Sequence, residues 1–167
     1  MIYKSYFLEQ NINSLNEKIT LLYGKNLGLK NDIKAKIIDN NKNAEILRYT
    51  QDDLIRDKRA LINEIEKHPN AVLLLDEVEK AHSSVTSVLL QVMDNGFITG
   101  SNGKKADLRN VILIMTSNLG AEEMERANLG FTETVKTADD DAVKNFFAPE
   151  FRNRLDSVIK FNKLDKA

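Results

Sequence analysis

Two groups of polar residues that could do chemistry follow uninterrupted apolar runs in the sequence. The run 71–75 leads directly into Asp76 and Glu77, and the run 111–115 leads into a Thr-Ser-Asn triplet that ends at Asn118. Five consecutive apolar residues suit a strand that is buried on both faces of a parallel sheet. A carboxylate pair after such a strand can hold a hydrated Mg²⁺ and activate a water molecule, and a neighbouring amide can orient that water or a phosphate oxygen.

The segment between the two runs predicts that both polar groups share one edge of the sheet. Apolar residues in 83–95 recur at helical spacing, and Gly96 ends the pattern. Strand, helix and strand in this order favour parallel strands, whose carboxyl ends meet at one rim. Nucleotide hydrolases place a Walker B acid pair and a polar sensor residue in this way. The alternative is that each strand stops simply where polar residues begin, and the residues alone leave both interpretations open.

Other local signals extend the α/β pattern over residues 51–167. Thr50 and Asp53 suit a capping box at the start of a helix that Pro69 ends, and the turn-rich segment 96–105 suits a hairpin. A further short strand is expected at 158–161. We therefore expect an α/β domain with a parallel sheet flanked by helices.

Residues 1–50 carry a different pattern. Their apolar residues recur at steps of four and three, which is a heptad seam: Leu8, Ile12, Leu15, Ile19, Leu22, Leu29 and Ile33. Asn26 fills one expected apolar slot, where a buried asparagine can fix register or oligomeric state. Gly24 and Gly28 each weaken a helix by roughly 1 kcal/mol. We expect a long helical, coiled-coil-like arm over 1–50, or one amphipathic helix packed on its own domain.

Composition narrows the class of protein. The chain has 167 residues, 42% of them hydrophobic and 29% charged, which indicates a folded protein. A net charge of -1 gives no global field for nucleic acid or an anionic membrane. The absence of cysteine excludes disulfides and thiolate metal sites. No apolar run is long enough to cross a bilayer, and the first ten residues lack the apolar core of a signal peptide, so we expect a cytoplasmic protein.

Three segments together resemble one protein family. They are HPNAVLLLDEVEKAH, LLQVMDNGFITGSNGKKADLRNVILIMTSNLG and FAPEFRNRLDSVIKFNKL. They are similar to the second ATPase module of the Clp-family AAA+ unfoldases, most closely that of ClpA. The resemblance implies a partial AAA+ fold, with a P-loop-type parallel sheet over 51–167.

The resemblance also implies roles for the residues at the rim. Asp76 would hold the Mg²⁺ of ATP, directly or through water. Glu77 would be the catalytic base that polarises the attacking water. Asn118 would be the first sensor, which reads the γ-phosphate from the neighbouring strand.

Two arginines in FRNRLD are candidates for an arginine finger. By resemblance, Arg154 would reach the ATP of the adjacent subunit in a ring, and Arg152 is a second candidate for the same surface. From the residues alone, both arginines suit ion pairs on a helix surface with Glu150 or Asp156.

The P-loop of the family, G-x-x-x-x-G-K-[ST], has no full counterpart before residue 68. The nearest segment is GKNLGLK at 24–30, whose glycines are four apart where the motif needs five, and which lacks GK[ST]. We interpret it as accidental and as part of the helical arm. The chain then lacks Walker A, should bind ATP and Mg²⁺ weakly, and has an exposed or arm-covered sheet edge where the strand before the loop is missing.

Three functions are compatible with these features. The first is a partial ATPase module of a ClpA-like unfoldase, inactive alone, which works with other AAA+ subunits in a ring, a Clp-type protease and unfolded protein substrates. The second is a non-enzymatic adaptor or inhibitor that docks on such a ring through the helical arm and Arg154. The third is an unrelated Mg²⁺-dependent phosphohydrolase built on Asp76 and Glu77.

Overall fold

A computed structural model describes the backbone of residues 2–4 and describes residues 18–24, 26–50, 53–54, 58–119 and 143–161 in full. The strands are β1 (Ile2–Lys4), β2 (Ile19–Gly24), β3 (Ile46–Tyr49), β4 (Val72–Leu75), β5 (Phe97–Thr99), β6 (Lys105–Asp107), β7 (Ile112–Ser117) and β8 (Ser157–Phe161). The helices are α2 (Leu27–Asn40), α4 (Lys58–Lys67), the 3-10 turn η2 (Val78–Lys80), α5 (Ser83–Asn95) and α8 (Pro149–Arg152).

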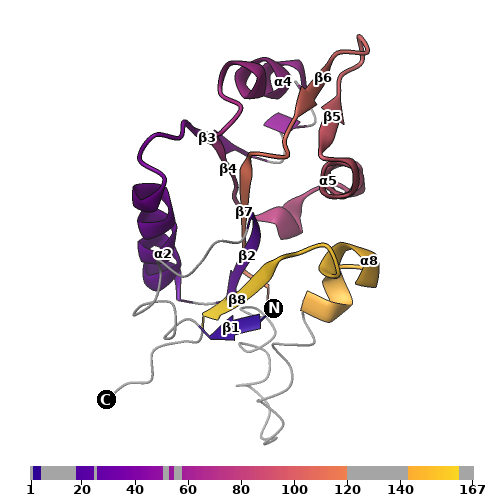
Figure 1. Cartoon of the computed structure of the whole chain (residues 1–167). Helices are drawn as coiled ribbons and strands as arrows, with labels where there is room; N and C mark the ends of the chain where they lie inside the picture. The colour runs from indigo at the N-terminus through magenta and orange to yellow at the C-terminus, as the bar shows by residue number, and fades with distance from the viewer. Residues whose placement is uncertain are drawn as a thin grey trace, which may run out of the picture.

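Six of these strands form one parallel sheet in the order β1-β8-β2-β7-β4-β3 (Figure 1). The register places Leu75 of β4 opposite Met115 of β7, and Tyr23 of β2 opposite Ser117 of β7. The carboxyl ends of β2, β4 and β7 therefore meet at one rim. The predicted α/β class and the parallel arrangement of the two apolar runs are confirmed.

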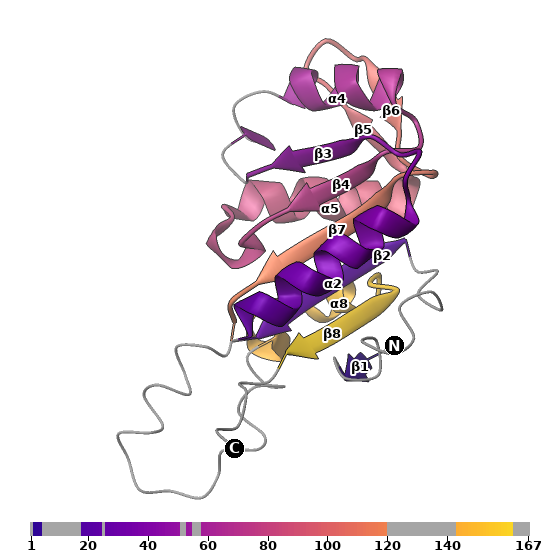
Figure 2. The ribbon, with the colours of Figure 1, turned by 90° about the vertical axis from the view of Figure 1, so that its left-hand side faces the viewer.

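Helices cover both faces of the sheet. Helix α2 lies on one face, and α5 and α8 lie on the other (Figures 1 and 2). Ile33 and Ile37 attach α2 to a cluster that includes Leu22 of β2 and Leu74 of β4. The opposite cluster contains the buried residues of α4 and α5, such as Ile65 and Leu89. Successive residues of a strand point to opposite faces of the sheet, so these apolar strands contribute side chains to both clusters.

Helix α5 fits its sequence signals closely. The His82 ring accepts a hydrogen bond from the Ser84 backbone N–H at 3.2 Å, so His82 is the N-cap. Gly96 ends the helix with φ +70°, in the left-handed region that glycine adopts at low cost. The predicted hairpin follows as the antiparallel pair β5–β6, and the predicted third strand is β8.

The expected helical arm is wrong for residues 19–49, which contribute two strands and one helix to the same sheet as the rest of the chain. The domain boundary expected at residue 50 therefore does not separate a helical arm from a sheet. Positions 5–17 of the expected arm lie outside the described residues. Leu21 and Leu22 are consecutive and both 0% exposed. A strand buried on both faces gains about 1.5–3 kcal/mol from each side chain, whereas a heptad seam would bury only one of the two.

The segment assigned to the interior of the arm is a strand–loop–helix junction. Gly24 ends β2 with φ +116°, and a Cβ there would lie 2.2 Å from the Phe161 carbonyl oxygen of β8, so only glycine fits. Asn26 is the N-cap of α2, with its Oδ1 accepting from the Leu29 N–H at 3.0 Å, and is not a register-fixing core residue. The strand expected to be missing is present as β2, inside the sheet between β7 and β8.

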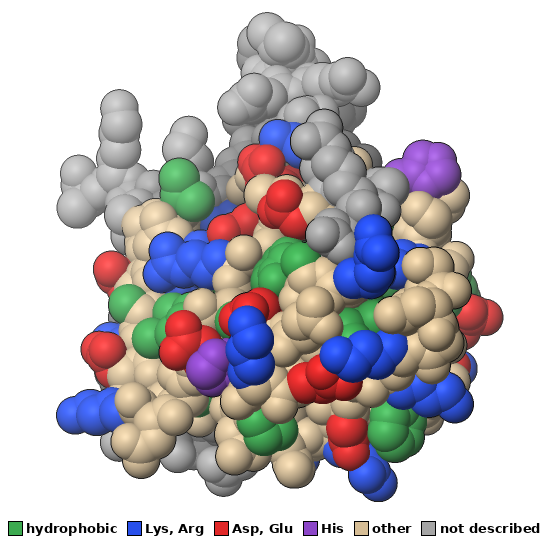
Figure 3. Space-filling model, turned by 90° about the horizontal axis from the view of Figure 1, so that it is seen from above, with side chains coloured by type: hydrophobic (Ala, Val, Ile, Leu, Met, Phe, Trp, Pro, Cys, Tyr) green, Lys and Arg blue, Asp and Glu red, His purple; other side chains and the backbone are tan. Residues whose placement is uncertain are grey.

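The surface over α4 and the β5–β6 hairpin carries lysine, arginine and acidic side chains interspersed, with hydrophobic side chains in separate small patches (Figure 3). Lys67 and Glu64 pair there at 2.6 Å, and Lys104 and Glu66 pair at 2.5 Å. No helix among the described residues is long and apolar enough to cross a membrane.

Candidate functional site

Asp76 follows β4 and faces α2 as well as β7. Its Oδ1 accepts a hydrogen bond from Thr116 Oγ1 at 2.8 Å and forms an ion pair with Lys34 Nζ at 3.1 Å. The Lys34 side chain is 19% exposed and that of Asp76 is 45% exposed. A hydroxyl and an ammonium thus already stabilise this carboxylate oxygen.

Glu77 is the one non-glycine residue with positive φ in the described part of the chain, at φ 56° and ψ 50°. This left-handed conformation costs roughly 1–2 kcal/mol for a residue with a Cβ, and such strain concentrates at functional sites. The Glu77 N–H donates to Thr116 Oγ1 at 3.3 Å, which helps to hold the turn. Glu77 Oε1 accepts from Asn118 Nδ2 at 3.5 Å and pairs with Lys80 Nζ at 3.0 Å.

Asn118 follows β7 and connects the acid pair to a buried lysine. Lys30 Nζ of α2 donates to Asn118 Oδ1 at 2.7 Å and to the Ser117 carbonyl oxygen at 3.0 Å. Lys30 is only 2% exposed. Burial lowers the pKa of Lys30 below its ordinary value, and the negative charge of Glu79 opposes that shift. The Asn118 N–H donates to Glu79 Oε1 at 3.1 Å.

The structure therefore brings Asp76, Glu77 and Asn118 together, as expected. It adds four residues that the sequence interpretation missed: Lys30, Lys34, Glu79 and Lys80. One signal could have found Lys30. It lies six positions after Gly24, the spacing of the lysine from the first glycine in G-x-x-x-x-G-K-[ST].

In the spacing of Gly24 and Lys30, the segment 24–30 is therefore similar to a P-loop, which the interpretation as an accidental match missed. It joins a buried strand to a helix N-terminus, as a P-loop does. Leu29 stands where the motif has its second glycine, and Asn31 stands where it has serine or threonine. Two backbone N–H groups in the first turn of α2 are occupied by Asn26, because its Oδ1 binds the Leu29 N–H and its carbonyl binds the Lys30 N–H at 3.0 Å.

A cavity of about 270 Å³ lies at this rim. It is lined by Leu27, Lys30, Asn31, Lys34, Asp76, Glu77, Thr116 and Asn118. Its volume is slightly below the range typical of sites that enclose a small organic molecule. Two lysines in the lining fit a phosphate.

Direct binding of Mg²⁺ does not fit Asp76 Oδ1. Asp76 was expected to hold Mg²⁺ directly or through water, but its Oδ1 is bonded to Lys34 Nζ and Thr116 Oγ1. Among the described residues there is no group of three or more histidine, cysteine, aspartate or glutamate side chains arranged to hold a metal ion.

The two arginine candidates lie outside this cavity lining. Arg154 Nε is bonded to the Asp94 carboxylate of α5, and its Nη1 donates to the Glu150 carbonyl oxygen at 2.6 Å. The Asp94 carboxylate raises the pKa of Arg154 above its ordinary value. Arg152 Nε donates to the Phe147 carbonyl oxygen at 3.1 Å. Both guanidinium groups are thus held by groups of their own chain.

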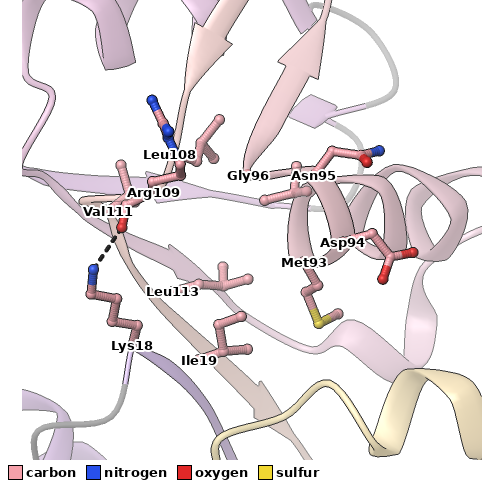
Figure 4. A pocket seen from close by; sticks show the side chains of 11 residues that line it. Lys18, Ile19, Met93, Asp94, Asn95, Gly96, Leu108, Arg109, Val111 and Leu113 are labelled. Atoms are coloured by element: carbon pink, nitrogen blue, oxygen red, sulfur yellow. Dashed lines mark hydrogen bonds between the residues drawn. The ribbon is translucent and has the colours of Figure 1, made fainter.

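A second cavity, of about 280 Å³, lies near the start of β2 and β7, at the opposite end of these strands (Figure 4). Its charged groups serve structural contacts: Lys18 Nζ donates to the Arg109 carbonyl oxygen at 2.7 Å, and the Arg109 side chain pairs with Asp107 at 2.6 Å. Asp94, also in the lining, binds Arg154. This cavity therefore lacks the acid pair and the amide that define the candidate site.

Sequence comparisons identify the family of the chain. The family described as AAA domain (Cdc48 subfamily) matches residues 29–158. The ClpA homolog protein of Fuscovulum blasticum is 53% identical over 107 residues, which make up 64% of this chain and 14% of that protein. The ATP-dependent Clp protease ATP-binding subunit ClpC of Staphylococcus saprophyticus is 41% identical over 115 residues, again 64% of this chain and 14% of that protein.

Solved structures show the same relationship. The S. cerevisiae Hsp104:casein complex in its extended conformation superposes with a TM-score of 0.71 and 32% sequence identity, over 96% of this chain and 32% of that one. The chain thus spans about one seventh of the length of the curated relatives named above, 14% in each case. Because the family match covers more than half of its residues, the chain belongs to the AAA domain (Cdc48 subfamily) family and, within it, to the Clp-type AAA+ unfoldases.

Proposed function

We propose that this chain is a nucleotide-site module of a ClpA-like, ATP-dependent protein unfoldase that binds the phosphates of ATP weakly and does not hydrolyse ATP by itself. The observation that carries the proposal is the convergence of Lys30, Glu77 and Asn118 on one rim, with Lys30 Nζ 2.7 Å from Asn118 Oδ1. Family membership supports nucleotide use, because relatives of this chain are named as ATP-binding subunits.

Weak binding follows from the departures at the phosphate loop. A P-loop grips phosphates with backbone N–H groups that its glycines leave accessible. Here Leu29 replaces one of these glycines, and Asn26 already occupies the Leu29 N–H. Lys30 remains as a cationic donor. Its ammonium already donates to the Ser117 carbonyl oxygen and to Asn118 Oδ1, so a phosphate would have to compete with these two acceptors.

In a complete site, Glu77 would polarise the attacking water and Asn118 would orient it against the γ-phosphate. Arg154 would complete the site of an adjacent subunit in a ring, after leaving Asp94. A Clp-type protease and unfolded protein substrates are the partners that this assembly implies.

The test of the proposal is a titration of a fluorescent ATP analogue into the purified chain and into Lys30→Met. Lys36→Met is the matched control, because Lys36 is an exposed lysine on the same helix. We expect a Kd of about 0.1–1 mM for the wild type and at least about tenfold weaker binding for Lys30→Met, as for loss of one charge-assisted contact. Lys36→Met should bind like the wild type, and none of the three should release phosphate.

A second variant tests the explanation for weak binding. Leu29→Gly combined with Asn31→Thr restores G-x-x-x-x-G-K-T at 24–31 and should tighten binding by at least about tenfold. Submicromolar binding by the wild type, no binding at millimolar analogue, or equal losses in Lys30→Met and Lys36→Met would each contradict the proposed function.

A further inference from the structure

Among the residues that the structure describes, the rim contains three carboxylates and three ammonium groups. Lys34 pairs with Asp76 at 3.1 Å, and Lys80 pairs with Glu77 at 3.0 Å. The carboxylates are Asp76, Glu77 and Glu79, and the ammonium groups belong to Lys30, Lys34 and Lys80. The formal charge of this set is therefore zero without any bound cation.

Lys34 is placed by the same helix that places Lys30. The two lysines are four positions apart, so they lie on one face of α2, one turn from each other. Ile33 and Ile37 are buried against the sheet and fix the rotation of the helix. The Lys34 ammonium is consequently held over Asp76 by a packed element, and its side chain is only 19% exposed.

The position of the Lys34 ammonium conflicts with a divalent cation. Mg²⁺ binds carboxylate oxygens at about 2.0–2.1 Å and requires near-octahedral geometry with several waters. Asp76 Oδ1 already receives the ammonium and the Thr116 hydroxyl, at 3.1 and 2.8 Å. A cation at this oxygen would have to displace both donors and would lie beside the positive charge of Lys34.

We propose that the Lys34 ammonium takes the place of the divalent cation at Asp76, so that this site binds phosphate groups without Mg²⁺. The part of this proposal that concerns nucleotide binding rests on the proposed function. The part that concerns metal exclusion does not, because Lys34 contacts Asp76 in the free protein. Lys34 then supplies a fixed positive charge beside Lys30 for a phosphate, and it excludes the metal ion from the acid pair.

The first experiment uses Mn²⁺ alone, measured by the electron paramagnetic resonance signal of the free ion. The wild type and Lys36→Met should show no saturable binding up to about 1 mM Mn²⁺, whereas Lys34→Met should bind at least about tenfold more tightly. Asp76→Asn added to Lys34→Met should abolish this gain. If Lys34→Met fails to fold, as judged by circular dichroism and thermal melting, Lys34→Gln retains a polar head group and takes its place.

Equal Mn²⁺ binding by the wild type and Lys34→Met, whether tight or absent, would overturn the proposal. The second experiment repeats the titration of the fluorescent ATP analogue in EDTA and in excess Mg²⁺. The wild-type Kd should agree between the two within about twofold, and the Kd of Lys34→Met should fall when Mg²⁺ is added. A wild-type Kd that tightens about tenfold with Mg²⁺ would also overturn it. Absence of nucleotide binding would contradict the proposed function, while the Mn²⁺ experiment would still decide the role of Lys34.

Discussion

Replacing Lys30 by methionine and, separately, by alanine distinguishes a buried lysine from an exposed one. Lys30 is 2% exposed, so alanine removes three buried methylene groups, worth about 0.8 kcal/mol each and about 2.4 kcal/mol together. Methionine keeps a side chain of similar length and apolar character. We therefore expect Lys30→Ala to be about 2–3 kcal/mol less stable than Lys30→Met.

The polar contacts of Lys30 determine how stable Lys30→Met is relative to the wild type. Both variants leave the buried Ser117 carbonyl without its 3.0 Å donor, at a cost of about 1–3 kcal/mol. The exposed Asn118 side chain can bind water instead. Removal of a buried ammonium acts in the opposite direction, as the lowered pKa of Lys30 indicates. The net cost of Lys30→Met should be below about 2 kcal/mol.

Urea unfolding at neutral pH measures these differences, and Lys36 supplies the matched pair. Lys36→Met and Lys36→Ala should lie within about 0.5 kcal/mol of each other, because Lys36 is exposed on the same helix. If Lys30→Ala and Lys30→Met also agreed within about 0.5 kcal/mol, the side chain would not be buried between α2 and β7. The placement of residues 19–49 in the sheet would then be refuted.

Three further variants test other parts of the fold. Gly24→Ala should cost more than about 2 kcal/mol in urea unfolding, because φ is +116° and a Cβ would meet the Phe161 carbonyl, whereas Gly103→Ala, with nothing near its Cβ, should cost about 1 kcal/mol; equal effects would contradict the close approach of β2 and β8. Phe151→Ala should cost about 3–5 kcal/mol, since Phe151 is 0% exposed and stacks on Phe147 at 4.7 Å, and the 43% exposed Phe146 provides the control, with a much smaller loss expected. Arg109 lowers the pKa of Asp107 from 3.8 to about 2, so this carboxylate stabilises the native state above pH 3.8 and loses that effect as the pH falls towards 2. Asp107→Asn should thus be less stable than the wild type at neutral pH, and the gap in melting temperature should close between about pH 4 and pH 2; a gap that stays constant would exclude the ion pair.

The strands that position the acid pair could be predicted because their signal is local. Positions 71–75 and 111–115 are continuous apolar runs, and both are buried on both faces of the sheet. The polar residues after them could be assigned to one rim from chain order alone. The contacts of Lys34 with Asp76 could not be predicted, because they depend on which way α2 faces after it packs on the sheet.

The heptad interpretation failed because local periodicity could not show the partners of β2. Ile19 and Leu22 fit the seam by spacing, but β2 pairs with β7 and β8, which lie far away in the sequence. The consecutive apolar residues Leu21 and Leu22 were the local sign of a strand with two buried faces. The Lys30–Asn118 contact spans 88 positions, so only the assembled sheet could bring these side chains together.

The central claim, that α2 delivers Lys30 to the rim beside the acid pair, is tested most directly by a double-mutant cycle between Lys30→Met and Asn118→Ala in urea unfolding. The 2.7 Å contact predicts a coupling energy of about 0.5–3 kcal/mol between the two positions. Lys36→Met with Asn118→Ala should give additive losses within about 0.5 kcal/mol. Additive losses in the Lys30 cycle as well would contradict the claim, because the two side chains would then not interact.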